Sequence, residues 1–324
     1  MDSVFDRELL VVSGKGGVGK TTIAAALGLL ASARGLRTII IEVGEQNRLC
    51  ELFDIPIEEP GSEAELQENL WSLSIDPDRA LLEWLQSLGG RVSGRVLASS
   101  GTFQYFTAAA PGARELVTMV KIWELTQRKH TRGRRRRYDL VLLDAPATGH
   151  ALGMLDSPRT FGAIARVGPI AAQAERLRQL LEDPARSDYL AVAHGSELAV
   201  TETLELQQRL TEQMGRSLRS VFVNSVLPQR FSPDELDRLS AIGRRDTSPA
   251  HSSASDQGSK RSAPLIRSAT SAAQAVSDRA RSQQNQIARL RRRGFDVTGV
   301  PFQFSAGLDL DAIRRIAGHL DRRL

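Results

Sequence analysis

The chain has 324 residues, of which 41% are hydrophobic and 25% charged, and this length is enough to bury a large core without covalent staples. Its one cysteine, Cys50, excludes a disulfide framework and a zinc site built from the cysteines of a single chain. No apolar run reaches the roughly 18 residues of a membrane span, and the N-terminus lacks the basic-then-apolar order of a signal peptide. We therefore expect a cytoplasmic protein.

The formal net charge of +5, from 43 Lys and Arg against 38 Asp and Glu, is concentrated in one run of arginines. The run consists of Arg132, Arg134, Arg135, Arg136 and Arg137. It could bind nucleic acid or an anionic membrane surface, but no aromatic residue that could stack on a base is interleaved with it. We expect a solvated loop rather than a nucleic-acid interface.

Apolar, β-branched runs predict the strands. Glu8–Ser13 leads into a glycine-rich turn, Thr21–Ala33 has apolar residues at helical spacing, and Thr38–Val43 is a second buried strand. This order is the start of a βαβ unit, which predicts an α/β fold with a mostly parallel sheet flanked by helices. Five later runs fit further strands: Leu70–Ile75, Leu140–Leu143, Tyr189–Ala193, Val221–Val223 and Val297–Val300.

We expect one domain over residues 1–324, with two departures from the strand–helix rhythm. Residues 79–130 contain several helical patterns and no strand candidate, which predicts a helical insertion. Residues 244–263 are rich in serine and almost lack large apolar side chains, so burial cannot offset the entropy of ordering them. This segment predicts a flexible loop, followed by a long helix over about 267–293.

The turn after the first strand carries a phosphate-binding motif. Gly14–Thr22 fits the Walker A pattern G-x-x-x-x-G-K-[ST] and lies between a strand and a helix. Its backbone N–H groups and the helix N-terminus would hold phosphate, Lys20 would reach the β- and γ-phosphates, and the Thr21 hydroxyl would bind Mg²⁺. The residues expected at the nucleotide are Gly14, Lys15, Gly16, Gly17, Val18, Gly19, Lys20, Thr21 and Thr22.

A second acidic element follows later in the chain. Tyr138–Asp144 is an apolar strand that ends in a carboxylate, which is the Walker B pattern. Asp144 would lie beside the phosphate loop and hold Mg²⁺ through water.

Several motifs resemble those of the ArsA family of P-loop ATPases. Lys15, the second lysine of the loop, resembles the deviant Walker A of the ParA, MinD and ArsA proteins. The Thr148–His150 triplet after the Walker B strand is similar to switch II of the ArsA branch, which comprises arsenite-pump ATPases and ATPases that target tail-anchored membrane proteins. Three further stretches are similar to elements of that family, in the expected order: Ala110–Glu115, Val221–Asn224 and Val300–Phe302.

The resemblance implies Mg²⁺-dependent hydrolysis of ATP by a nucleotide-sandwich dimer. Lys15 would reach the nucleotide of a second subunit, either a copy of this chain or a close paralogue. The resemblance further implies that Asn224 reads the adenine and that a loop at Pro301 closes over it. Opening and closing of the dimer would act on an unidentified client, which could be a membrane protein.

Switch I departs from the family pattern. The family's Asp, which positions the attacking water, falls on Gly44 in this chain. Glu45 is the expected replacement as a catalytic carboxylate, and Glu42 is the alternative. A third interpretation is that both glutamates only face solvent at the end of the strand. The chain also has no Cys-x-x-Cys, and Cys50 alone does not provide the several thiolates that As(III) needs.

Two other functions stay open. One is a ParA/MinD-like positioning ATPase on membrane or nucleoid, since Leu308–Leu324 has the amphipathic pattern of a membrane-seeking helix. A helix docked on the sheet has the same pattern, so we do not expect direct membrane insertion. The other is a nucleotide-binding scaffold with negligible turnover, which the missing switch I Asp would explain.

Overall fold

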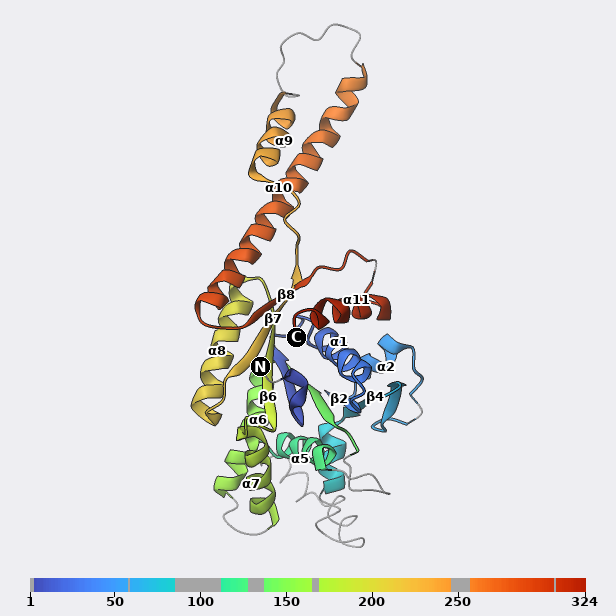
Figure 1. Ribbon diagram of the computed structural model, residues 1–324, viewed down its shortest axis with the longest axis vertical. Helices are drawn as coiled ribbons and strands as arrows, with labels where there is room; N and C mark the ends of the chain where they lie inside the picture. Colours follow the sequence, from blue (N-terminus) through green and yellow to red (C-terminus); the bar gives the residue numbers. More distant parts are fainter. Residues whose placement is uncertain are drawn as a thin grey trace, which may run out of the picture.

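The computed structural model describes residues 3–57, 59–84, 112–127, 137–164, 169–245, 257–305 and 307–324. Its strands form one sheet in the order β3-β4-β2-β5-β1-β6-β7-β8 (Figure 1). They are β1 (Leu9–Gly14), β2 (Thr38–Val43), β3 (Ala64–Gln67), β4 (Leu70–Ile75), β5 (Leu140–Asp144), β6 (Ser187–His194), β7 (Leu218–Val226) and β8 (Val297–Pro301). All neighbouring pairs are parallel except β3 and β4, which confirms the predicted α/β fold.

Helices cover both faces of this sheet (Figure 1). They are α1 (Lys20–Ala33), α2 (Arg48–Phe53), α5 (Ala113–Gln127), α6 (Thr148–Ile164), α7 (Pro169–Glu182), α8 (Glu197–Met214), α9 (Pro233–Arg245), α10 (Gln257–Arg292) and α11 (Leu310–Asp321). The core on one face is built with α1, α2 and α11, and the core on the other face with α5 to α8 and the C-terminal part of α10.

The central strands are buried on both faces, which explains their unbroken apolar runs. In β2, Ile39 and Ile41 pack into the core on the α5 side, while Ile40 packs into the core on the α1 side. The short edge strand Ala64–Gln67 was not among the predicted strands. It is antiparallel and irregular, and its partly exposed polar residues form no apolar run.

The C-terminal helix α11 docks on α1 rather than presenting an apolar face to solvent. Its buried residues are Ala312, Ile313, Ile316, Ala317 and Leu320, and they lie in the core on the α1 face. Across the described ranges, no helix has both the length and the apolar character needed to span a bilayer.

The expected loop at 244–263 is partly helical. Residues 244–245 end α9, and α10 begins at Gln257 instead of near residue 267, while 246–256 lie outside the described residues. A helix in a hairpin needs only one contact stripe, so a low apolar content does not prevent it. The side chain of Gln274 on α10 donates a hydrogen bond to Ser240 of α9 at 2.6 Å. The two helices form a hairpin that extends away from the sheet (Figure 1).

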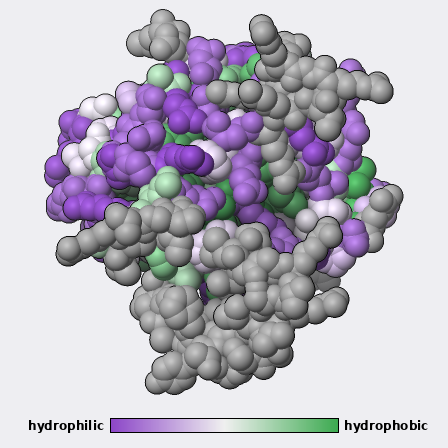
Figure 2. All heavy atoms as spheres, turned by 90° about the horizontal axis from the view of Figure 1, so that it is seen from below, coloured by the Kyte–Doolittle hydropathy of each residue, from purple (hydrophilic) through white to green (hydrophobic). Residues whose placement is uncertain are grey.

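The structure describes only part of the predicted insertion at 79–130. Helix α5 lies within the predicted insertion, and residues 79–84 are also helical. Leu81 and Met119 are buried in the core of the sheet domain. The view from the side of α5 and α7 shows a mostly hydrophilic described surface (Figure 2). Of the arginine run, only Arg137 is described, and it forms an ion pair with Glu63.

Candidate functional site

The phosphate loop is pressed tightly against the neighbouring strands. Gly14 has φ +150°, and a Cβ there would lie 2.1 Å from the carbonyl oxygen of Val192 on β6. Gly19 has φ +89°, and a Cβ there would lie 2.2 Å from Nδ2 of Asn224 on β7. Only glycine allows this approach. Gly19 is also the N-cap of α1 and contributes no side-chain cap, so the first amides of α1 remain free to bind an anion.

Lys20 lies at the first position of α1 and is held inside the loop. Its ammonium group donates a hydrogen bond to the carbonyl oxygen of Lys15 at 3.2 Å. Burial lowers the pKa of Lys20 below its ordinary value, and the nearby charge of Asp144 acts in the opposite direction. The loop therefore holds a partly desolvated cation where the β- and γ-phosphates would lie.

Thr21 and Asp144 meet at the predicted metal site. The Thr21 hydroxyl donates a hydrogen bond to Oδ2 of Asp144 at 2.5 Å. Asp144 Oδ1 is buried and has no hydrogen-bond partner in the described part of the chain. Burial raises the pKa of Asp144 to about 6, against the lowering effects of Thr21 and Lys20. A buried carboxylate oxygen without a partner and a hydroxyl beside it are hard oxygen donors, which fit Mg²⁺.

The two candidate switch I carboxylates lie in different environments. Glu45 is exposed. Glu42 is 6% exposed, and on the adjacent strand its register partner is Asp144. Burial raises the pKa of Glu42 to about 7, although it accepts a hydrogen bond from the backbone N–H of Leu49 at 3.2 Å. The structure thus places Glu42, and not Glu45, beside the predicted metal ligand.

Lys15 is paired within its own chain. Its ammonium group lies 2.6 Å from Oε1 of Glu202 on α8, and both side chains are about one-third exposed. The pair lines a cavity between the phosphate loop, the start of α6 and α8, together with Thr148 and Leu206. The sequence did not predict the pairing of Glu202 with Lys15, because Glu202 reaches Lys15 only through the packing of α8.

A second cavity, of about 310 Å³, lies on the other side of the loop against β7, β8 and α11. The predicted base-binding residues Asn224 and Pro301 both line it, together with Val18, His194 and Phe302. The Asn224 amide donates a hydrogen bond to the carbonyl oxygen of Val18 at 2.9 Å and so joins β7 to the loop. His194 was not predicted here, because strand β6 brings it to the site from a distant part of the sequence.

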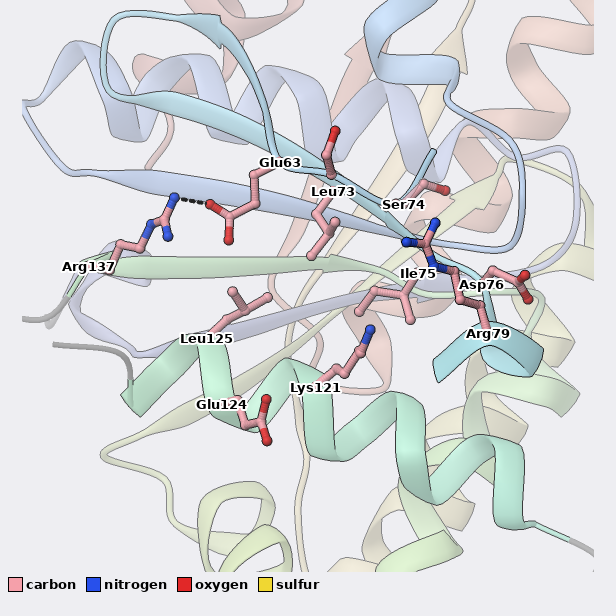
Figure 3. Close-up of a pocket in the computed structure, with 12 residues that line it drawn as sticks. Glu63, Leu73, Ser74, Ile75, Asp76, Arg79, Lys121, Glu124, Leu125 and Arg137 are labelled. Atoms are coloured by element: carbon pink, nitrogen blue, oxygen red, sulfur yellow. Dashed lines mark ion pairs between the residues drawn. The ribbon is translucent and has the colours of Figure 1, made fainter. Parts of the chain in front are cut away.

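A further pocket, of about 370 Å³, lies between β4 and α5 and is lined by charged side chains (Figure 3). Arg137 pairs with Glu63 at one end of it (Figure 3), and Lys121 lies 2.5 Å from Glu83. No residue of the Walker motifs lines this pocket. The described residues contain no group of three or more His, Cys, Asp or Glu side chains that could hold a metal ion by itself.

Comparison with known proteins gives the same assignment as the motifs. Residues 7–168 match the family model of the ArsA ATPases, described as anion-transporting ATPases. The ATPase BagA of Mycobacterium tuberculosis is 34% identical over 235 residues, which is 70% of this chain and 68% of the relative. The ATPase GET3 of Lachancea thermotolerans is 25% identical over 263 residues, which is 70% of this chain and 74% of the relative. A putative arsenical pump-driving ATPase of Halobacterium salinarum is 25% identical over 246 residues, 70% of this chain and 37% of the relative.

Proposed function

This chain belongs to the ArsA family of anion-transporting ATPases and is an ATP-hydrolysing P-loop enzyme; from that premise we propose that it works with Mg²⁺ as a two-subunit nucleotide sandwich that drives a client protein. The observation that carries the proposal is the arrangement of three side chains around the first turn of α1. Lys20 faces the loop, and the Thr21 hydroxyl meets a buried Asp144 whose second oxygen has no partner in the described part of the chain.

In the proposed reaction, water attacks the γ-phosphate in line with the leaving oxygen. The loop amides and Lys20 neutralise the charge that develops on the phosphate oxygens. Thr21 and Asp144 would hold Mg²⁺, Asp144 through water. Bound there, Mg²⁺ would supply further charge neutralisation for the β- and γ-phosphate oxygens. The base of ATP would lie in the cavity of Asn224 and Pro301, and the loop after Pro301 would cover it.

The two-subunit arrangement rests on Lys15. Lys20 already lies where the phosphates would bind, so the loop does not need a second lysine there. Lys15 points instead to the surface cavity beside α8. We propose that nucleotide-driven dimerisation moves Lys15 from Glu202 to the nucleotide of the other subunit. The partner is a second copy of this chain or a close paralogue.

The chemistry of this chain argues against a metalloid client. Relatives of this chain include a putative arsenical pump-driving ATPase. Cys50 is the only cysteine of this chain and is 4% exposed, so a site of several thiolates for As(III) cannot form within one subunit. We propose a protein client instead, with membrane proteins, the class that the family resemblance implies, as the first to test. The buried apolar face of α11 does not favour the alternative of a membrane-seeking C-terminus.

The test is steady-state ATP hydrolysis by the purified chain with and without Mg²⁺, with the mass in solution recorded with and without nucleotide. We expect Mg²⁺-dependent turnover, a dimer in the presence of ATP, and loss of turnover by at least about 100-fold in Lys20→Ala and in Asp144→Asn. Tight ATP binding without turnover in the unmodified chain would instead establish a nucleotide-binding scaffold. Turnover that persists in Lys20→Ala would contradict the proposed site.

A further inference from the structure

We propose that Glu42 is the second acidic residue of the metal site and acts as a positioning residue, which links the occupancy of that site to helix α2. The inference rests on the proposed Mg²⁺-dependent function and deepens it. It concerns a position outside the Walker motifs, in the strand that precedes the altered switch I. Its basis is the placement of one carboxylate between Asp144 and the first turn of α2.

Strand geometry brings the two carboxylates together. Side chains alternate along a strand, so Glu42 lies on the same face of β2 as Ile40, and Asp144 on the same face of β5 as Leu142. Ile40 and Leu142 both belong to the core on the α1 side. Parallel pairing sets Glu42 directly beside Asp144 in register. Both carboxylates therefore face the helix whose first turn carries Lys20 and Thr21.

Glu42 also takes over the capping of α2. Asn47 occupies the N-cap position of this helix but makes no side-chain cap. The orphan amide of Leu49 donates to Oε2 of Glu42 instead, at 3.2 Å, and Leu49 is fully buried. Because the free amides at a helix start need an acceptor, the position of α2 depends on the position of this carboxylate.

Only the helix side of switch I depends on Glu42. The loop before α2 is fixed separately to β4, where the single hydroxyl of Ser74 lies within hydrogen-bond distance of the carbonyl oxygens of Gly44 and Gln46, at 2.7 and 2.9 Å. A change in the charge or orientation of Glu42 is therefore transmitted to the first turn of α2 without breaking these loop contacts.

The charges around Glu42 explain why a cation bound at Asp144 would attract its carboxylate. Glu42 and Asp144 are both buried and close enough for the Asp144 charge to disfavour ionisation of Glu42. The positive charge of Lys20 stabilises the ionised form of Asp144, and the positive charge of Arg48 stabilises the ionised forms of both Asp144 and Glu42. A divalent cation held by Asp144 and Thr21 would draw the Glu42 carboxylate toward it, directly or through a bound water. The helix capped by that carboxylate would follow.

The experiment measures binding and helix protection, not turnover. Affinity for the non-hydrolysable analogue adenylyl-imidodiphosphate is determined by calorimetry with and without Mg²⁺, and hydrogen exchange is followed at the amides of residues 48–53. The variants are Glu42→Gln, which is isosteric and can still accept the Leu49 hydrogen bond, and Glu42→Asp, which keeps the charge. Glu65→Gln, which neutralises an exposed glutamate on the edge strand β3, is the matched control.

In the unmodified chain we expect Mg²⁺ to raise the affinity for the analogue and to protect the α2 amides. Glu42→Gln should keep the Mg²⁺-free affinity and lose roughly 10- to 100-fold of the Mg²⁺ enhancement together with the added protection. Glu42→Asp should recover part of both, and Glu65→Gln should behave like the unmodified chain.

Two results would overturn the inference, and they are distinguishable. If Glu42→Gln behaves like the unmodified chain in both readouts, Glu42 has no part in the metal site while the proposed function stands. Should Glu42→Gln not fold, Glu42→Ala, which also removes the charge, takes its place in the same comparison. If Mg²⁺ has no effect on nucleotide affinity even in the unmodified chain, the proposed Mg²⁺-dependent function fails and the inference fails with it.

Discussion

The ammonium group of Lys15 lies 2.6 Å from the carboxylate of Glu202, so the second lysine of the phosphate loop is paired with α8 of its own chain. Both side chains are about one-third exposed, and exposed ion pairs of this kind contribute about 0–1 kcal/mol. Such a pair holds the lysine in one orientation and opens easily. It therefore competes with any use of Lys15 on a partner subunit, and weakening it should favour that use.

The first prediction concerns this competition. Glu202→Gln removes the negative charge and releases Lys15, so the proposed dimer should form at a lower protein concentration. We expect turnover at sub-saturating protein concentration to rise by up to about fivefold, which corresponds to about 1 kcal/mol. The measurement is ATPase activity as a function of protein concentration.

Glu205→Gln is the matched control for this prediction. Glu205 lies one turn along α8 and lines the same cavity, but it is exposed and forms no ion pair with Lys15 in the structure. Its neutralisation should leave the concentration dependence unchanged. A fall in turnover in Glu202→Gln would show that Glu202 supports catalysis rather than restraining Lys15.

The second prediction concerns Asn224. Its amide donates to the carbonyl oxygen of Val18, and an aspartate of the same size cannot donate there and would place two oxygens together. Asn224→Asp should therefore lower the stability by about 1–3 kcal/mol and the affinity for ATP by about tenfold or more. Thermal unfolding and nucleotide titration check the two effects.

Asn285→Asp makes the same chemical change at an exposed position of α10 and should have neither effect. If Asn224→Asp binds ATP as tightly as the unmodified chain, Asn224 is not part of the base site, and the role implied by the family resemblance does not apply to this chain.

The sequence predicted the parts of this protein that are local. Strand Thr38–Val43 is buried on both faces and reads as an apolar run, and the Walker A motif contains its own turn, donors and helix start. The edge strand Ala64–Gln67 was missed because an exposed, irregular strand needs no apolar pattern. The helix over 257–263 was missed because this serine-rich stretch has no apolar residues at helical spacing.

The parts of the site that depend on topology could not be read from the sequence. Glu202 and His194 reach the loop because β6 pairs with β1 and α8 follows β6. The choice between Glu42 and Glu45 required the register of β2 with β5, since only that register places Glu42 beside Asp144. Motifs identified the phosphate end of the site, and strand order supplied its surroundings.

The third prediction compares two glycines of the phosphate loop. In Gly14→Ala the new Cβ would lie 2.1 Å from the backbone oxygen of Val192, which is a severe clash. In Gly17→Ala the new Cβ would have no atom within 4 Å, so the only cost is the backbone strain of an alanine at φ +80°. We expect a loss of about 3 kcal/mol or more for Gly14→Ala and about 1–2 kcal/mol for Gly17→Ala. Urea unfolding measures both, and equal losses would contradict the close packing of the loop on β6.

The last prediction tests whether Lys15 acts on the other subunit. Lys20→Ala destroys the phosphate contact of its own subunit but leaves Lys15 available to a partner, and Lys15→Ala does the reverse. A mixed dimer of the two variants would therefore contain one complete site, formed by the loop of the Lys15→Ala subunit and the Lys15 of the other.

Each variant alone should be inactive or nearly so. Equal mixing places about half of the chains in mixed dimers with one of two sites complete, so we expect about a quarter of the unmodified activity to return. ATPase activity as a function of the mixing ratio should peak near equal amounts. If Lys15 acts only within its own chain, no mixture recovers activity, because each subunit then carries one broken site that its partner cannot repair.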